Sequence, residues 1–222
     1  MEGMKAEGAP VMVTDAQGEE PLVLRTDQGA VTTLTLNRPR QFNALSSAML
    51  AALQMELDRI GTDSSVRVVV LAAAGKAFCA GHDLKEMRAH ADKEFQSALF
   101  AQCSEMMLTI NRLPQPVIGR VHGLATAAGC QLVAACDLAV AVDSAQFATS
   151  GIRVGLFCST PSVAVSRNLP RKKALEILLT GEFIDAQTAA REGRGSFVVD
   201  GLMVDEPILV RARRILALAG AA

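Results

Sequence analysis

The sequence predicts an α/β domain in which parallel strands are covered by helices. Short apolar runs typical of buried strands alternate along the chain with longer stretches that have helical periodicity. The chain has 222 residues, half of them hydrophobic, which is enough to bury one core. The right-handed crossover rule winds successive strand and helix units in one direction, so we expect a superhelical arrangement.

The first half of the chain predicts a hairpin, a helix and a buried strand. Residues 1–20 are polar and rich in glycine and predict a flexible arm. Ser46 is a suitable cap for a helix that ends near Gly61. The hairpin is predicted at 22–37 around a turn at 27–29, and the buried strand at 67–74.

The second half predicts a long helix and then repeated strand and helix segments. Apolar residues from Phe95 to Leu113 recur at helical spacing, and Pro114 and Pro116 stop the pattern. Further strands are expected in PVIGRV and LAVAV, a buried helix in TAAGCQLVAACD, and two short helices between Pro161 and Thr180. The expected core domain covers residues 21–200.

The overall charge excludes several classes of partner. The chain has 22 basic and 23 acidic residues, so a nucleic acid or an anionic membrane has no electrostatic attraction to it. It has no Trp or Tyr for base stacking. The first twenty residues resemble neither a signal peptide nor an organelle transit peptide, so the default prediction is a cytoplasmic protein.

The cysteines and histidines predict neither a disulfide framework nor a metal centre. The five cysteines lack C-x-x-C spacing, and buried, reduced thiols are expected. There are three histidines and no H-E-x-x-H motif, so no metal ligand set is predicted. Nucleotide-binding glycine motifs and the G-x-S-x-G motif of serine hydrolases are also absent.

Two loops of small residues, FCAGHDL at 78–84 and GLATAAGCQ at 123–131, are the candidate functional segments. Each follows a predicted strand and leads toward a helix, where free main-chain N–H groups favour negative charge. Brought together, two such loops would form an oxyanion hole. Composition alone favours a simpler interpretation, in which Ala and Gly only allow a helix to pack closely on a strand.

Five ordered segments resemble the crotonase superfamily, also called the enoyl-CoA hydratase/isomerase family. They are LNRPRQFNAL, GKAFCAGHDLKEM, PQPVIGRVHGLATAAGCQLVAACDLAVA, FATSGIRVGLFCSTP and RKKALEILLTGEFIDAQTAAREG, within residues 22–199. Within the family, AAGCQL and GLFCSTP are similar to a subgroup, the enoyl-CoA hydratase domain-containing protein 3 type. The resemblance implies a crotonase-like spiral of repeated β-β-α units.

The resemblance also implies a ligand and a way of binding it. The ligand is an acyl or enoyl thioester of coenzyme A from fatty-acid metabolism, with no permanently bound cofactor. The amides of His82 and Ala128 would hold the thioester carbonyl and stabilise an enolate. Residues expected to bind the coenzyme A part are Arg38, Arg40, Asn43, Ala44, Ala80, Asp83, Leu84 and Lys85, the basic ones being equally suited to be solvated surface charges.

The chain departs from the family at the positions that move protons. The two glutamates of family hydratases fall at Gln131 and Gly151, neither of which can act as a base. Carboxylates used by other members fall near Ser159 and Arg153. Between Met106 and Leu175 the only carboxylates are Asp137 and Asp143, for which a turn or capping role is expected. The remaining polar candidates are Cys130, Cys158, Thr160 and the His82 side chain.

The end of the chain is the second departure. One amphipathic helix is expected at 205–218 as a shortened C-terminal segment in 201–222. Family members continue with helices that close the acyl pocket and join subunits, so the homotrimer or hexamer that the family implies is uncertain for this chain.

Three functions therefore stay open on the sequence. The first is a hydratase or isomerase of formal lyase class, whose hydration of enoyl thioesters is expected to be weak or absent. The second is an acyl-CoA-binding or regulatory protein without turnover. The third is another thioester reaction, such as decarboxylation or hydrolysis. Restoring both glutamates, at Gln131 and Gly151, is expected to raise hydratase activity if the pocket is otherwise intact.

Overall fold

The structure is a computed structural model that describes residues 20–192, 197–199 and 202–203. The predicted N-terminal arm, apart from residue 20, lies outside these ranges. So does the helix predicted at 205–218. The core domain predicted at 21–200 is described over most of its length.

The described strands form two sheets. The larger has the order β1-β2-β3-β5-β7-β10-β11 and the smaller has the order β4-β6-β8-β9. The larger sheet contains β1 Val23–Gln28, β2 Val31–Leu36, β3 Val68–Ala73, β5 Val117–Val121, β7 Leu138–Ala141, β10 Phe197–Val199 and β11 Leu202–Met203. The smaller contains β4 Ala77–Cys79, β6 Leu124–Thr126, β8 Gln146–Ala148 and β9 Ile184–Asp185.

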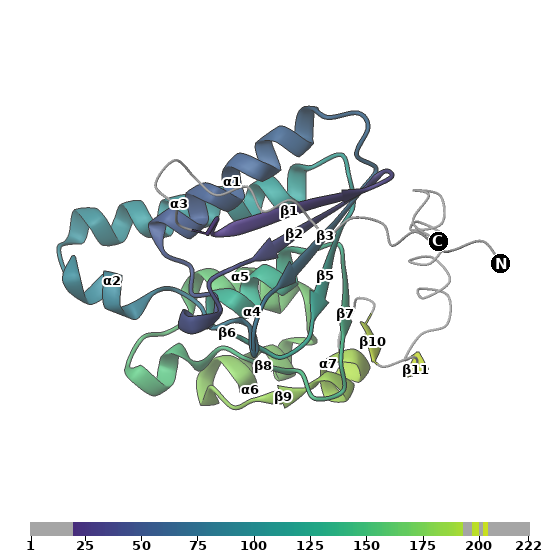
Figure 1. The fold of residues 1–222 in the computed structure, drawn as a ribbon. Helices are drawn as coiled ribbons and strands as arrows, with labels where there is room; N and C mark the ends of the chain where they lie inside the picture. The colour runs from purple at the N-terminus through teal and green to yellow at the C-terminus, as the bar shows by residue number, and fades with distance from the viewer. Residues whose placement is uncertain (1–19, 193–196, 200–201, 204–222) are drawn as a thin grey trace.

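The helices connect the strands and cover the sheets (Figure 1). They are α1 Ser47–Thr62, α2 Leu84–Ala89, α3 Lys93–Arg112, α4 Ala128–Ala135, α5 Ser159–Asn168, α6 Arg171–Thr180 and α7 Ala186–Glu192, with two 3-10 turns, η1 Pro39–Gln41 and η2 Ser150–Val154. Among the described residues, no helix combines the length and hydropathy needed to cross a bilayer.

The predicted spiral of β-β-α units is confirmed by the order in which strands join the two sheets. β3 enters the larger sheet and β4 the smaller, and α2 and α3 follow. β5, β6 and α4 repeat this order, and so do β7, β8 and the helices after them. The pairs β3·β5, β5·β7, β4·β6 and β6·β8 are all parallel, as crossover connections require.

The longer predicted elements are present with small shifts at their ends. Ser46 caps α1 through its side chain, which accepts a hydrogen bond from the N–H of Met49. The apolar residues at helical spacing in α1 are buried, and α1 packs on α3 (Figure 1). The hairpin is β1 and β2, and α1 continues one residue beyond the expected end at Gly61.

The short strands β4 and β6 lie where the sequence predicts only small-residue loops. Each has three residues, too few to show a period of two in the sequence. Their parallel pairing puts β4, at the start of the first candidate segment, beside β6 in the second. The topology therefore joins the two candidate functional segments, although the sequence does not reveal the strands that join them.

Asn43 connects three loops beside this junction. Its side chain is fully buried, and its Oδ1 accepts from the N–H of Arg38 at 2.8 Å. Its Nδ2 donates to the carbonyls of Ala74 and Ala77, both at 2.8 Å. Its φ of 53° lies in the left-handed region, which Asn tolerates better than most residues. The hydrogen bonds of Asn43 therefore go to main chain of its own protein.

We expect Asn43→Ala to lower the free energy of unfolding by about 3 kcal/mol, because two buried carbonyls and one N–H lose their partners. Asn37→Ala is the matched control, since the Asn37 side chain makes one hydrogen bond, to the carbonyl of Pro21 at 3.0 Å. Urea denaturation of the three proteins measures the difference. Equal losses for both variants would contradict the role given to Asn43.

Candidate functional site

A cavity of about 390 Å³ lies where the two candidate segments meet η2 and the start of α5. Its walls come from three places in the chain. The segments around α2 and α3 contribute Ala80, His82, Leu84, Met87 and Phe100; the start of α4 contributes Ala127 and Ala128; and the segment from η2 to α5 contributes Ser150, Gly151, Val154, Leu156, Phe157, Cys158, Ser159, Thr160 and Pro161.

Two residues that line the cavity, His82 and Ala128, have main-chain N–H groups with no acceptor among the described residues. The bridge between Leu45 and His82 uses the N–H of Leu45 and that of Asp83, so it leaves the N–H of His82 unused. Ala128 is the first residue of α4, where a helix offers no acceptor. Neither group has a partner within the described part of the chain.

The backbone around Ala128 depends on close contacts between small residues. Ala127 has φ 51° and ψ −121°, an unusual conformation for a residue with a side chain, and its N–H bonds the carbonyl of Ala148 at 2.9 Å. A Cβ on Gly129 would lie 2.1 Å from the carbonyl oxygen of Cys79. Glycine at 129 is therefore required for α4 to start against β4.

The His82 side chain lies in the same wall. Its ring packs against Phe100, with 5.0 Å between the ring centroids, and its Nε2 is buried without a hydrogen-bond partner. Burial lowers the pKa of His82 to about 4, with the charge of Glu86 opposing the shift. The imidazole is therefore neutral at pH 7.

The three positions predicted to correspond to the family's acid and base groups differ in their access to the cavity. Gly151 and Ser159 line it, whereas Gln131 lies one helical turn beyond Ala128, is 6% exposed and does not line it. The Oε1 of Gln131 has no hydrogen-bond partner. No Asp or Glu is among the described residues that line the cavity.

Gly151 has no room for a side chain. A Cβ there would lie 2.4 Å from the carbonyl oxygen of Leu156 and 2.8 Å from the Sγ of Cys158. A glutamate at 151 would thus require the main chain around 156–158 to move. The expectation that two restored glutamates raise hydratase activity does not fit this geometry, because the second one has no space.

The residues expected to bind coenzyme A fall into two groups. Asn43 and Ala44 are buried, and Arg38 Nη1 donates to the Asp83 carboxylate at 2.7 Å. Burial raises the pKa of Asp83, but the hydrogen bonds from Arg38 and from the N–H groups of α2 outweigh it, so the pKa lies below its ordinary value. These four residues hold the loop together.

The second group is open to a ligand. Leu84 and Ala80 line the cavity. Arg40 and Lys85 are exposed and form no ion pair among the described residues. These four residues of the predicted set either line the cavity or are exposed.

Asp137 and the cysteines have structural positions. The Asp137 carboxylate accepts from the N–H of Val117 at 2.8 Å, which agrees with the turn role expected for it. The cysteines are free and mostly buried, as predicted, and burial raises the pKa of Cys130 to about 12. Among the described residues, no three metal-binding side chains come together.

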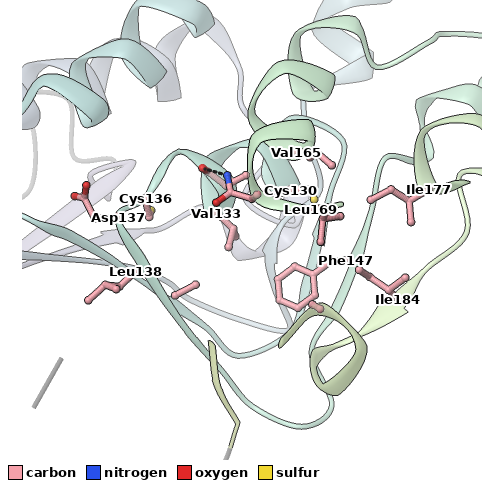
Figure 2. A pocket seen from close by; sticks show the side chains of 14 residues that line it. Cys130, Val133, Cys136, Asp137, Leu138, Phe147, Val165, Leu169, Ile177 and Ile184 are labelled. Carbon is pink, nitrogen blue, oxygen red and sulfur yellow. Dashed lines mark hydrogen bonds between the residues drawn. The ribbon is translucent and has the colours of Figure 1, made fainter. Parts of the chain in front are cut away.

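A second cavity of about 60 Å³ lies between α4, α5 and α6, and Figure 2 shows its side chains. Phe147, Leu169, Ile177 and Ile184 point toward one another there (Figure 2). Asn168, at its edge, donates to the carbonyl of Ala134 at 3.0 Å, so its amide is engaged. The space is a gap in an apolar core, and the larger cavity remains the candidate site.

Comparison with known proteins assigns the chain to a family. A family model described as enoyl-CoA hydratase/isomerase matches residues 26–219. The chain belongs to the enoyl-CoA hydratase/isomerase family. The predicted family and fold are therefore confirmed.

Two solved structures of the family are similar to this chain in fold and sequence. One, described as an enoyl-CoA hydratase from Mycobacterium smegmatis, is 60% identical with a TM-score of 0.82 and covers 89% of this chain and 77% of its own. Human enoyl-CoA hydratase domain-containing protein 3 is 43% identical with a TM-score of 0.81 and covers 88% of this chain and 78% of its own.

Curated relatives in the family support the predicted subgroup. The mitochondrial enoyl-CoA hydratase domain-containing protein 3 of Rattus norvegicus is 44% identical over 91% of this chain, and that of Homo sapiens is 46% identical over 85%. The matches span 67% and 62% of those relatives. The chain thus spans about two thirds of their length.

The prediction of a cytoplasmic protein is wrong by this comparison. Five relatives of this enoyl-CoA hydratase/isomerase family member, from Rattus, Mus, Xenopus, Danio and Homo, are all named mitochondrial. The prediction depended on the composition of the first twenty residues, and the lack of a recognisable targeting pattern there was too weak a basis for assigning a compartment.

The protonation of His82 should make the free energy of unfolding depend on pH. In the folded state His82 stays neutral down to about pH 4, whereas an unfolded histidine binds a proton near pH 6.5. The unfolded state therefore binds more protons in this window, so His82 adds up to roughly 3 kcal/mol of pH dependence, present above pH 6.5 and lost as the pH falls toward 4.

We expect His82→Gln to flatten the curve of unfolding free energy against pH between 6.5 and 4, measured by urea denaturation. His90→Gln, at the exposed C-cap of α2, is the control and should keep the wild-type slope. An unchanged slope in His82→Gln would contradict the burial of this imidazole in its neutral form.

Gly151 provides a second test of the site. Gly151→Ala places a methyl group against the carbonyl of Leu156, so we expect a loss of about 1–3 kcal/mol in unfolding free energy. For the same reason, Gln131→Glu combined with Gly151→Glu should show no gain in crotonyl-CoA hydration. Gly119→Ala is the control, since a Cβ there meets Cys136 Sγ at an ordinary 3.5 Å. If Gly151→Ala is as stable as the wild-type protein, the main chain at 156–158 can move to accept a side chain, which would contradict the packing described above.

Proposed function

We propose that this chain binds a fatty acyl thioester of coenzyme A and holds its carbonyl oxygen on the N–H groups of His82 and Ala128. The observation that carries the proposal is that both residues line one cavity and that neither N–H group has an acceptor in the described part of the chain. A thioester oxygen between them gains two hydrogen-bond donors that need no rearrangement. The start of α4 adds the positive end of a helix dipole.

The walls suit a hydrocarbon acyl group. Met87, Phe100, Leu156 and Phe157 supply apolar surface, and His82 and Cys158 are the ionisable side chains in the described walls. Arg40 and Lys85, which are exposed and form no ion pair with another described residue, are the candidates for the phosphates of coenzyme A. Arg38 is less suited to that role because it is paired with Asp83.

Carbonyl polarisation favours negative charge on the thioester oxygen, and therefore favours an enolate, but adding water also needs a base. Gln131 and Gly151 supply none, and the described walls contain no carboxylate. Burial raises the pKa of Cys158, so this thiol is a poor base and a poor nucleophile. The function supported best is acyl-CoA binding with polarisation of the carbonyl and little or no hydration.

The same site meets only part of what decarboxylation needs. Decarboxylation requires enolate stabilisation without a base, but no Arg or Lys among the described residues lines the cavity to hold a second carboxylate.

Val154, Leu156 and Phe157 are exposed, which fits the family's homotrimer or dimer of trimers. Light scattering of the purified protein tests that assembly.

Infrared spectroscopy with acetyl-CoA carrying ¹³C at the thioester carbonyl tests the proposal. We expect the carbonyl stretch to move to lower frequency on binding, because two hydrogen bonds lengthen the C=O bond. Titration calorimetry with acetyl-CoA and with coenzyme A alone measures binding separately. Binding without any shift would contradict the role of the two N–H groups.

The companion measurement is the absorbance of crotonyl-CoA. We expect its loss to be no faster than without protein, since the cavity lacks a base. Rapid hydration would show that a proton-transfer group has been overlooked, even if the carbonyl shift is present.

A further inference from the structure

Helix α2 forms part of the cavity wall although it is hardly buried itself. Leu84 and Met87 are three residues apart, so they lie on one face of the helix, and both line the cavity. None of the six residues of α2, all of which the structure describes, is buried. Burial of apolar side chains therefore contributes little to the position of this helix, which depends on polar contacts instead.

Two sets of hydrogen bonds hold the ends of α2. At its start, the Asp83 carboxylate accepts from main-chain N–H groups of the first turn. At its end, the Gln96 side chain of α3 donates to the carbonyls of Met87 at 2.9 Å and His90 at 2.8 Å. A third contact, in the body of the helix, is made by Glu86.

Glu86 joins α2 to the start of α1. Its carboxylate accepts from the N–H of Ser47 at 3.0 Å and from the Ser47 hydroxyl. Ser47 is the first residue of α1, where main-chain N–H groups have no acceptor within the helix. The first turn of α1 has no acidic residue of its own. The negative charge that favours a helix start is thus supplied by a residue 39 positions away.

The carboxylate of Glu86 lies within electrostatic reach of the cavity wall. Burial lowers the pKa of His82, which lines the cavity, and the charge of Glu86 opposes this shift. The main chain of His82 is held separately, because Leu45 forms hydrogen bonds with the residues on either side of it. The N–H donors of the candidate site therefore do not depend on Glu86, whereas the wall formed by α2 does.

We propose that Glu86 is a positioning residue for the acyl wall of this cavity. By bonding the start of α1, it fixes α2 so that Leu84 and Met87 face the ligand, and it thereby sets the affinity for acyl chains long enough to reach them. Glu86 is not among the residues that line the cavity, so it acts through the helix. This inference rests on the proposed function, in which the cavity holds a fatty acyl thioester.

Calorimetric titration with acetyl-CoA and with octanoyl-CoA tests the inference by comparing a short chain with one that extends along the wall. We expect Glu86→Ala to weaken binding of octanoyl-CoA about tenfold, the equivalent of about two buried methylene groups, and to change binding of acetyl-CoA less than about twofold. The infrared shift of the labelled acetyl-CoA carbonyl should stay as in the wild-type protein, because its N–H donors are held independently.

Glu94→Ala is the matched control, because Glu94 also lies in the first turn of a helix and is exposed. It should bind both thioesters as the wild-type protein does. Ser47→Ala removes the hydroxyl and keeps the N–H, so we expect a smaller loss of octanoyl-CoA affinity, about threefold. Combining it with Glu86→Ala should add nothing to the loss in Glu86→Ala alone. Thermal melts establish that each variant is folded, and Ser47→Ala carries the test if Glu86→Ala is not.

The outcomes separate this inference from the function on which it rests. Unchanged binding of octanoyl-CoA by Glu86→Ala would overturn the role of Glu86 and leave thioester binding standing. An equal loss for acetyl-CoA, or a changed carbonyl shift, would also overturn it, since the whole site would then be disturbed. Additive losses in the double variant would show that Glu86 does not act through Ser47. If the wild-type protein binds neither thioester, both proposals fail.

Discussion

The candidate site depends on the contact between the main chain of β4 and the start of α4. Gly129 has no side chain, and a Cβ in its place would lie 2.1 Å from the carbonyl oxygen of Cys79. A Cβ on Gly81 would lie 2.9 Å from the Cβ of Ala127. Only residues this small let two segments about fifty positions apart place their N–H groups on one cavity. The alanine and glycine content of these segments is thus both a packing requirement and the origin of the binding surface.

The surrounding structure stabilises an arrangement that is locally costly. Ala127 has a positive φ, and buried polar atoms of His82 and Gln131 lack partners. The parallel pairing of β4 with β6, the hydrogen bonds of Asn43 and the Arg38–Asp83 ion pair hold the neighbouring loops in place. Several residues that the family resemblance implies as ligand contacts therefore act by holding the loops that form the site.

The sequence predicts the elements that have long hydrophobic patterns well, and it predicts close contacts between distant segments poorly. The hairpin, α1, α3 and the buried strands follow from periodicity, because many residues contribute to each pattern. β4 and β6 are too short to have one. The sequence itself shows that positions 131 and 151 carry no carboxylate. It does not show that the carbonyl of Leu156 leaves no room for a side chain at 151, because this carbonyl belongs to a turn with no distinctive composition. The buried roles of Asn43 and Asp83 likewise require their partners to be known.

The residues at 131 and 151, glutamine and glycine, are physically consistent with each other. A carboxylate buried without a partner is strongly unfavourable in its charged form, so an apolar cavity retains a glutamate only when solvent or another polar group reaches it. With glycine at 151, the chain at 156–158 fills the space that a side chain would need. A glutamate at 131 would then lack both solvent and a partner, whereas glutamine keeps nearly the same shape and remains neutral. A neutral side chain at 131 is therefore the physically consistent companion of glycine at 151.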